Sequence, residues 1–288
     1  MAKGKKKRSK RAQALLKYML IFTVVIVGVF SMFTVLTIKS HLKEKEIRDK
    51  EIAKQEAIEA EKEAKRKAKE HLEEVKATAI EQEYPEKIIE LLDKNPETVE
   101  YVEKYPELKD SEPAAEITEL KEGEIPHILQ WDSRWGYYPY GSGTIATSGC
   151  GPTCISMVIS GLTGDKTVTP AKMADYAIQH GYLDSENNTA WAFITNAPKD
   201  YGIEVSDVLH TTETLTKAIE EGSVVLCNVG PGVFTEIGHY ILIVGQKDGK
   251  LVVHAPFNVE RSKKTWGYEE FSDQIKGMWT FTYSKPAE

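Results

Sequence analysis

The C-terminal part of the chain, residues 125–288, is predicted to fold as one α+β domain. Helical patterns come first, at residues 150–162, 170–180, 190–201 and 212–221. Apolar runs typical of strands follow, at residues 224–229, 239–246, 250–254 and 278–283. Lys247-Asp248-Gly249 separates two of these runs and is typical of a tight hairpin, so we expect helices packed on an antiparallel sheet.

The first 38 residues predict a membrane anchor. Residues 1–17 carry eight Lys or Arg and no acid, and the 21 residues of 18–38 include no charge. Such a run crosses a hydrocarbon core, which needs ~20 residues, and exceeds the about 7–15 of a signal-peptide core. Because basic flanks stay inside, the basic tail is expected in the cytoplasm and residues from 39 onward outside it.

Residues 39–83 predict a charged helical stalk. They are rich in Lys, Glu and Ala, contain no Gly or Pro, and place opposite charges at helical spacing, as in Glu61 and Lys65. As one helix the segment would measure ~60 Å. Its apolar positions are mostly alanine without a sustained heptad, so oligomerisation through the stalk is open but only weakly supported.

Residues 84–124 are expected to form a short helical pair followed by an acidic linker over 109–124. Asn95 before Pro96 suits a helix cap with proline in the first turn. Without the basic tail, the chain holds 29 basic against 44 acidic side chains, which argues against a nucleic-acid partner.

Three cysteines are too few for a disulfide-stapled domain. Cys154 and Cys227 are expected to be small buried hydrophobic residues. A zinc site made from the three cysteines and His239 lacks the close paired spacing of zinc motifs, so we expect no metal and no cofactor.

Cys150 is the candidate nucleophile. It stands in Ser148-Gly149-Cys150-Gly151-Pro152-Thr153, at the start of a predicted helix. Unpaired amides and the helix dipole favour a thiolate there, and an imidazolium partner would lower the thiol pKa further. The flanking glycines would let a substrate backbone approach, and the Cys150 amide would donate to an oxyanion. The alternative is a helix start that happens to contain a buried cysteine.

His239 is the candidate base. It follows Gly238 and heads an apolar strand, where a side chain reaches the rim of a site. The alternative is a satisfied core histidine. His254, at the end of the next strand, is a weaker rival because no glycine opens the chain beside it.

Several segments together resemble the stand-alone relatives of the bacteriocin-leader (double-glycine) cysteine peptidases, a peptidase family thirty-nine-like group of the papain-like superfamily. The most specific are Thr147-Ser148-Gly149-Cys150-Gly151-Pro152-Thr153 and Gly238-His239. Leu129-Gln130-Trp131-Asp132-Ser133-Arg134-Trp135 and the helical prelude at 91–98 are similar as well. The resemblance covers roughly residues 84–283 and implies a papain-like cysteine peptidase domain.

The resemblance implies that Cys150 is the nucleophile, His239 the general base and Gln130 an oxyanion donor. A loop glutamine that packs on the nearby tryptophans is the other interpretation of Gln130. The family usually places an aspartate where this chain has Ala255. Asn258 is therefore the candidate residue for orienting the imidazole, because asparagine does so in papain-like proteases.

Together these features predict a membrane-anchored, extracytoplasmic bacterial cysteine peptidase that cleaves peptides or envelope proteins through a Cys150 thioester. Two alternatives stay open. Ala255 favours a catalytically inactive papain-like module that binds peptides or cell wall. The order of Cys before His also fits a peptidoglycan endopeptidase or amidase.

Overall fold

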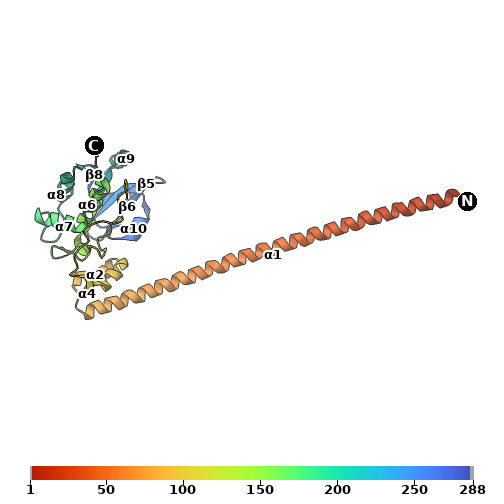
Figure 1. Ribbon diagram of the computed structural model, residues 1–288, viewed down its shortest axis with the longest axis horizontal. Helices are drawn as coiled ribbons and strands as arrows, with labels where there is room; N and C mark the ends of the chain where they lie inside the picture. Colours follow the sequence, from red (N-terminus) through yellow and green to blue (C-terminus); the bar gives the residue numbers. More distant parts are fainter. Residues whose placement is uncertain (1, 286–288) are drawn as a thin grey trace. The chain divides into compact units, whose positions relative to one another are not determined.

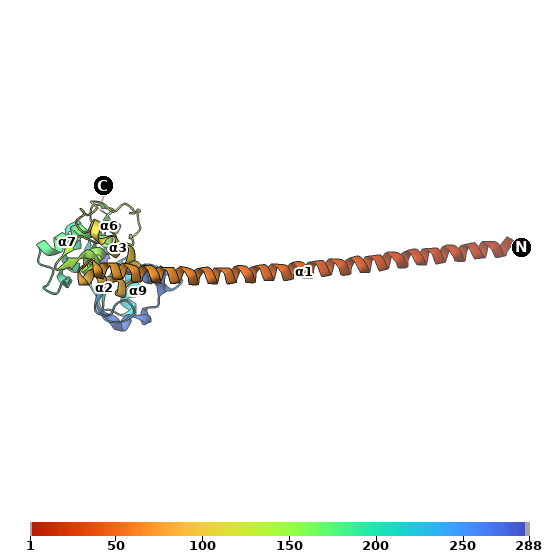
Figure 2. The same ribbon diagram turned by 90° about the horizontal axis from the view of Figure 1, so that it is seen from below.

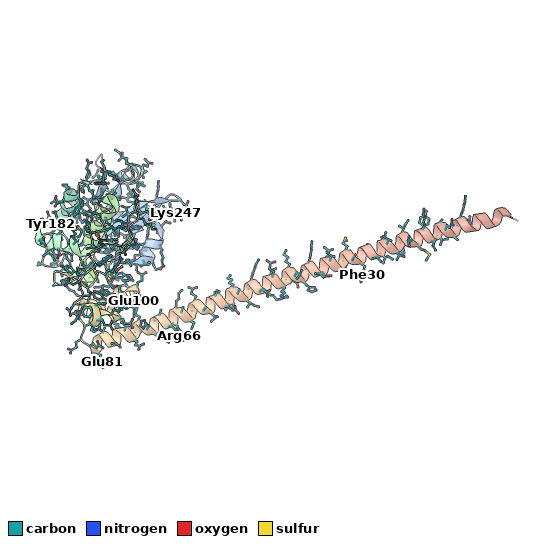
Figure 3. All side chains as sticks on the ribbon, viewed as in Figure 1. Phe30, Arg66, Glu81, Glu100, Tyr182 and Lys247 are labelled. Carbon is teal, nitrogen blue, oxygen red and sulfur yellow. The ribbon has the colours of Figure 1, made fainter. Side chains whose placement is uncertain are left out.

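A computed structural model describes the backbone of residues 2–285 and the side chains from residue 10 onward. It has two compact units, Met1–Glu70 and His71–Glu288. The first unit is part of one helix, α1 (Ala2–Glu81), in which Phe30 projects from the apolar segment with 73% of its surface exposed (Figure 3). Among the described residues, this helix is long and apolar enough to cross a membrane.

The second unit begins with the last turns of α1 and a helical prelude. The prelude consists of α2 (Glu86–Lys94), the 3-10 helix η1 (Pro96–Thr98), α3 (Val99–Glu103) and α4 (Tyr105–Leu108). Val75 and Leu92 belong to the apolar cluster that joins the prelude to Trp131 and Phe257 of the following domain. The predicted Asn95 cap is confirmed, because its side-chain oxygen accepts the Glu97 amide at 3.2 Å. The prelude is therefore packed on the domain.

A six-stranded antiparallel sheet forms the centre of the domain and confirms the predicted α+β class. The strand order is β3 (Glu204–Asp207), β8 (Ile275–Thr282), β4 (Val224–Val229), β5 (His239–Lys247), β6 (Lys250–His254) and β7 (Thr265–Trp266). Asp248 and Gly249 close the β5–β6 hairpin with φ of 52° and 74°, the left-handed conformation that the Asp-Gly pair favours. A small pair, β1 (Pro139–Tyr140) and β2 (Gly143–Thr144), stands apart from this sheet.

Helices cover both faces of the sheet. One face packs on α5 (Ile145–Ser148), α6 (Cys150–Thr163), α7 (Pro170–Gln179), α8 (Trp191–Asn196) and η2 (Ala197–Tyr201). The other packs on α9 (Thr212–Glu220), and Figures 1 and 2 show α9 apart from α6 and α7. The period-two alternation explains the division, because Leu226 faces the α6 side and its neighbour Val225 the α9 side. Three short helices, α10 (Val259–Lys263), η3 (Tyr268–Glu270) and η4 (Ser272–Gln274), connect the later strands.

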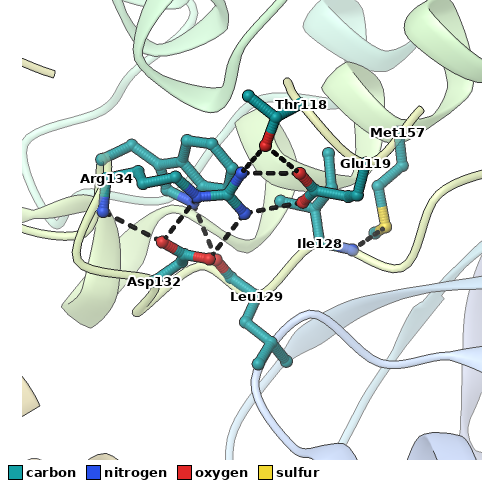
Figure 4. A network of polar contacts seen from close by, with 8 residues as sticks. Thr118, Glu119, Ile128, Leu129, Asp132, Arg134 and Met157 are labelled. Atoms are coloured by element: carbon teal, nitrogen blue, oxygen red, sulfur yellow. Dashed lines mark hydrogen bonds and ion pairs between the residues drawn. The ribbon is translucent and has the colours of Figure 1, made fainter. Parts of the chain in front are cut away.

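The acidic segment 109–124 is partly packed on the domain. Ile117 is fully buried in the core cluster. Arg134 pairs with Glu119 at 2.6 Å and with Asp132 at 2.7 Å, and Thr118 joins this network (Figure 4). The Arg134 guanidinium lowers the pKa of Glu119 to about 2. The segment is therefore fastened at its C-terminal end by one buried aliphatic residue and one ion-pair network.

Candidate active site

Cys150 is the first residue of α6 and differs from the other two cysteines. Its side chain is partly exposed, whereas Cys154 and Cys227 are fully buried. Cys154 lies in the cluster on the α6 face of the sheet and Cys227 in the cluster on the α9 face. The sheet therefore separates two of the thiols that a shared zinc site would need.

The glycines beside Cys150 are required by packing. A Cβ at Gly149 would lie 2.6 Å from the carbonyl oxygen of Ile145, and a Cβ at Gly151 would lie 2.9 Å from the Thr189 side chain. Both distances are closer than packed atoms tolerate. The sequence predicts that these glycines admit a substrate. In the structure they also allow the first turn of α6 to pack against α5 and Thr189.

Cys150 lies beside the peptide unit that follows His239. The backbone amides of Tyr240 and Gly151 lie close enough to its sulfur to lower the pKa of the thiol, and its own amide acts in the same direction. One turn further along α6, the Cys154 thiol donates to the Tyr240 carbonyl at 3.5 Å. The packing of α6 on β5 therefore places Cys150 next to the backbone of the residue that follows His239 in the chain.

Two tyrosines and Thr189 lie near Cys150. The Tyr140 hydroxyl lies 2.9 Å from the Thr189 hydroxyl, and the Tyr240 hydroxyl donates to the Thr189 carbonyl at 2.9 Å. Burial raises the pKa of both tyrosines, and the nearby Cys150 raises it further. These hydroxyls therefore remain neutral hydrogen-bonding groups. The sequence alone assigned no role to Thr189.

Burial dominates the electrostatics of the pair. It raises the pKa of the Cys150 thiol, although the amide hydrogen bonds oppose this. It also lowers the pKa of His239 to about 4, and the Arg261 guanidinium contributes in the same direction. The expected lowering of the Cys150 pKa is therefore wrong, because dehydration of the sulfur outweighs the amides that favour a thiolate. At neutral pH the free protein holds a thiol and a neutral imidazole.

The His239 ring is enclosed and lacks a polar anchor. Its side chain is 8% exposed, and Nε2 is buried with no hydrogen-bond partner within residues 2–285. The Phe257 ring meets the imidazole nearly edge-on, with centroids 6.3 Å apart and an interplanar angle of 74°. The sequence has no local pattern that predicts this contact. It depends on the antiparallel pairing of β5 with β6, which brings the start of β5 near the end of β6.

Asn258 does not orient His239, which corrects the expectation from the sequence. Its side-chain oxygen accepts the Arg261 amide at 2.8 Å and caps α10, while its amide group donates to Asn95 at 3.3 Å. Ala255, at the usual aspartate position, is fully buried. Asparagine is a favoured helix N-cap residue, and that local role occupies the side-chain oxygen of Asn258.

Gln130 is buried at 4% exposure and is held by α5. Its Nε2 donates to the Ala146 carbonyl at 2.8 Å, and its backbone amide donates to the Pro256 carbonyl at 2.8 Å. Its Oε1 is buried without a hydrogen-bond partner among the described residues. The structure thus fixes the glutamine between the segment before the nucleophile and the segment after β6.

His254 is part of a different cluster. Its ring lies 5.0 Å from that of His127, whose Nε2 is 3.2 Å from the Ala255 carbonyl. Burial lowers the pKa of His254 to about 4, and the neighbouring His127 adds to the shift. The Tyr240 amide near the Cys150 sulfur belongs to the residue that follows His239, whereas His254 ends β6. The sequence did not single out His127, because a lone histidine in a loop segment has no recognisable pattern.

A family model described as the Peptidase_C39 like family matches residues 122–285. None of the curated proteins searched matches the chain.

Three solved structures are similar. A C39-like peptidase from Bacillus anthracis has 13% identity and a TM-score of 0.40, covering 56% of this chain and 96% of that one. The peptidase domain of Streptococcus ComA, a bi-functional ABC transporter involved in quorum sensing, has 18% identity and a TM-score of 0.37, covering 48% and 93%. A double glycine motif protease from an AMS/PCAT transporter, in complex with the leader peptide, has 15% identity and a TM-score of 0.33, covering 59% and 98%.

Proposed function

The chain belongs to the Peptidase_C39 like family, and from this premise we propose that it is a cysteine peptidase with Cys150 as nucleophile and His239 as general base. One observation carries the assignment. The only partly exposed thiol among the described residues lies near the backbone amide of Tyr240, the residue next to His239 in the chain. A thiol at a helix N-terminus and a histidine at the start of the strand on which that helix packs supply the two groups that acyl transfer by a thiol needs.

The reaction begins from the neutral pair. His239 takes the Cys150 thiol proton as the sulfur attacks the peptide carbonyl carbon. The C–N bond then breaks, the imidazolium gives its proton to the leaving amine, and a thioester remains on Cys150. His239 next removes a proton from water, which attacks the thioester, and the proton returns to the sulfur as the acid leaves.

Backbone amides beside the sulfur are candidate hydrogen-bond donors for the developing oxyanion. The amides of Cys150 and Gly151 point toward the sulfur, where the carbonyl carbon would be attacked. Gln130 supplies a second type of donor through the Nε2 hydrogen that Ala146 leaves free. Fixed donors of this kind need no reorganisation when charge develops, so they stabilise the transition state more than the ground state.

The enzyme is further proposed to be anchored in the cell membrane through residues 18–38, with the basic tail in the cytoplasm and the peptidase domain outside. The uncharged run and its basic flank support this topology. The substrates in this arrangement are peptides or envelope proteins exposed on the extracytoplasmic side of the same membrane.

The first test compares the full-length protein with Cys150→Ala and His239→Ala on a peptide library. We expect cleavage products from the unchanged chain and none above background from either variant. Cleavage that survives Cys150→Ala would refute the nucleophile assignment. Mass spectrometry of products also identifies the bond that is cut.

A catalytically inactive peptide-binding module is a second candidate, and a specific observation favours it. Nε2 of His239 is buried without a partner among the described residues, and Arg261 rather than a carboxylate influences the ring. Such a module binds peptides with equal affinity before and after Cys150→Ala and releases no product. Turnover that depends on Cys150 excludes it.

A further inference from the structure

The turn between α2 and η1 makes polar contacts with a segment far along the chain. Asn95 Nδ2 donates to the Phe257 carbonyl at 2.5 Å. The Glu97 carboxylate accepts the amides of Val259 at 2.7 Å and Glu260 at 3.0 Å, which are the first amides of α10. A carboxylate at unpaired helix amides is stabilising, so the turn fixes the entry into α10.

The segment held in this way carries the residue that touches the catalytic ring. Phe257 packs edge-on against His239, and its carbonyl is also bound by the Trp131 indole N–H at 2.8 Å. Asn95 is 1% exposed, so its contacts lie in a dehydrated interface where hydrogen bonds hold geometry firmly. Ala255 provides no polar group for the imidazole, which leaves packing to fix the ring.

We propose that the Asn95–Glu97 turn is a positioning element of the catalytic pair, because it holds Phe257 against the His239 imidazole and so sets the ring's orientation. This inference rests on the proposed peptidase function. The turn lies outside residues 122–285, the part that matches the family, so the proposed positioning contact comes from the prelude of this chain and not from the matched domain.

The test uses the full-length protein with Glu97→Gln, Phe257→Ala and the double variant. Glu107→Gln is the matched control, since it removes the same charge from an exposed site on α4. We expect Phe257→Ala to lower kcat about tenfold and Glu97→Gln about threefold, each with KM within about twofold. Because Glu97 acts through Phe257, the double variant is expected to match Phe257→Ala rather than the product of the two losses.

A second readout is the rate at which iodoacetamide alkylates Cys150 at pH 7. Removing the Phe257 ring admits water to His239, which raises the pKa of His239 and makes the thiolate–imidazolium pair more accessible. We therefore expect alkylation several-fold faster in Phe257→Ala, and to a smaller degree in Glu97→Gln. Cys154 and Cys227 are fully buried, so a folded chain gains one adduct and an unfolded chain three.

The inference is overturned if Glu97→Gln behaves as Glu107→Gln in both readouts, or if the losses in kcat multiply. If Glu97→Gln gains three adducts, that variant is unfolded. The Phe257→Ala variant then provides the test, and a wild-type kcat together with a wild-type alkylation rate would refute the positioning role. If the unchanged protein cleaves nothing, the peptidase proposal fails while the alkylation rates still test the positioning.

Discussion

The charge beside a catalytic histidine decides at which pH it can act as a base. In this chain the pKa of His239 is lowered to about 4, first by burial and second by Arg261. Arg261 is held by its own contacts, since its guanidinium donates to the Phe234 carbonyl and its amide to Asn258. Glu97 and Glu236 face the guanidinium from the prelude and from the loop before β5. A cation therefore lies near the ring.

Replacing Arg261 by Gln is expected to move the acid limb of the kcat/KM profile to higher pH. Without the guanidinium the pKa of His239 rises from about 4 toward its ordinary value, so more of the base is protonated at pH 5. The measurement is kcat/KM between pH 4 and 8. Lys263→Gln removes a charge from an exposed site on the same helix and serves as control. An acid limb unchanged by Arg261→Gln would contradict the assignment.

At the scale of elements, the sequence predicts what local periodicity specifies. The helix at Cys150–Thr163 and the strands at Val224–Val229 and Lys250–His254 are confirmed within a residue or two, because each has a clear apolar pattern. The strand at Glu204–Asp207 was not predicted, since its one apolar residue gives no alternation and only pairing with β8 stabilises it.

The same reasoning explains which parts of the site could be anticipated. Cys150 and His239 are marked locally, by flanking glycines and by the start of a strand. The hydrogen bonds from the prelude to Phe257 and to the start of α10 join residues more than 150 positions apart, as in the Glu97 to Val259 hydrogen bond. A pattern within one window contains no information on such pairs. Asn258 was misassigned because its local role as a helix cap was overlooked.

The contact of β6 with residues 126–130 predicts sensitivity to acid. His254 has a pKa of about 4 in the folded chain and about 6.5 unfolded, so the unfolded state binds the additional proton between these values. Stability should therefore be full above about pH 6.5 and fall as the pH approaches 4, by up to about 3 kcal/mol from this group.

Chemical unfolding of the full-length protein at several pH values measures this loss. His254→Gln cannot take up the proton, so its free energy of unfolding should depend less steeply on pH over the same range, even if it is lower at pH 7. Parallel curves for the two proteins would mean that His254 does not contribute to the acid sensitivity.

At the scale of the whole molecule, charge is divided sharply along the chain. Residues 1–17 are basic, residues 18–38 are uncharged, and the remainder is acidic. An apolar helix face as exposed as that of Phe30 is unfavourable in water and suits lipid. The proposed topology follows from these two facts, and the peptidase domain would then meet only substrates outside the cytoplasm.

Single cysteines on α1 provide the test of this topology. Ala12 and Ala57 are both exposed and lie on opposite sides of the apolar segment. In a Cys150→Ser background the remaining thiols are buried, so label should report only the new site. We expect a membrane-impermeant maleimide to label Ala57→Cys in intact cells and Ala12→Cys only after permeabilisation, since basic flanks stay inside. The reverse pattern would place the peptidase domain in the cytoplasm, and labelling of both sites in intact cells would show that the segment does not span the membrane.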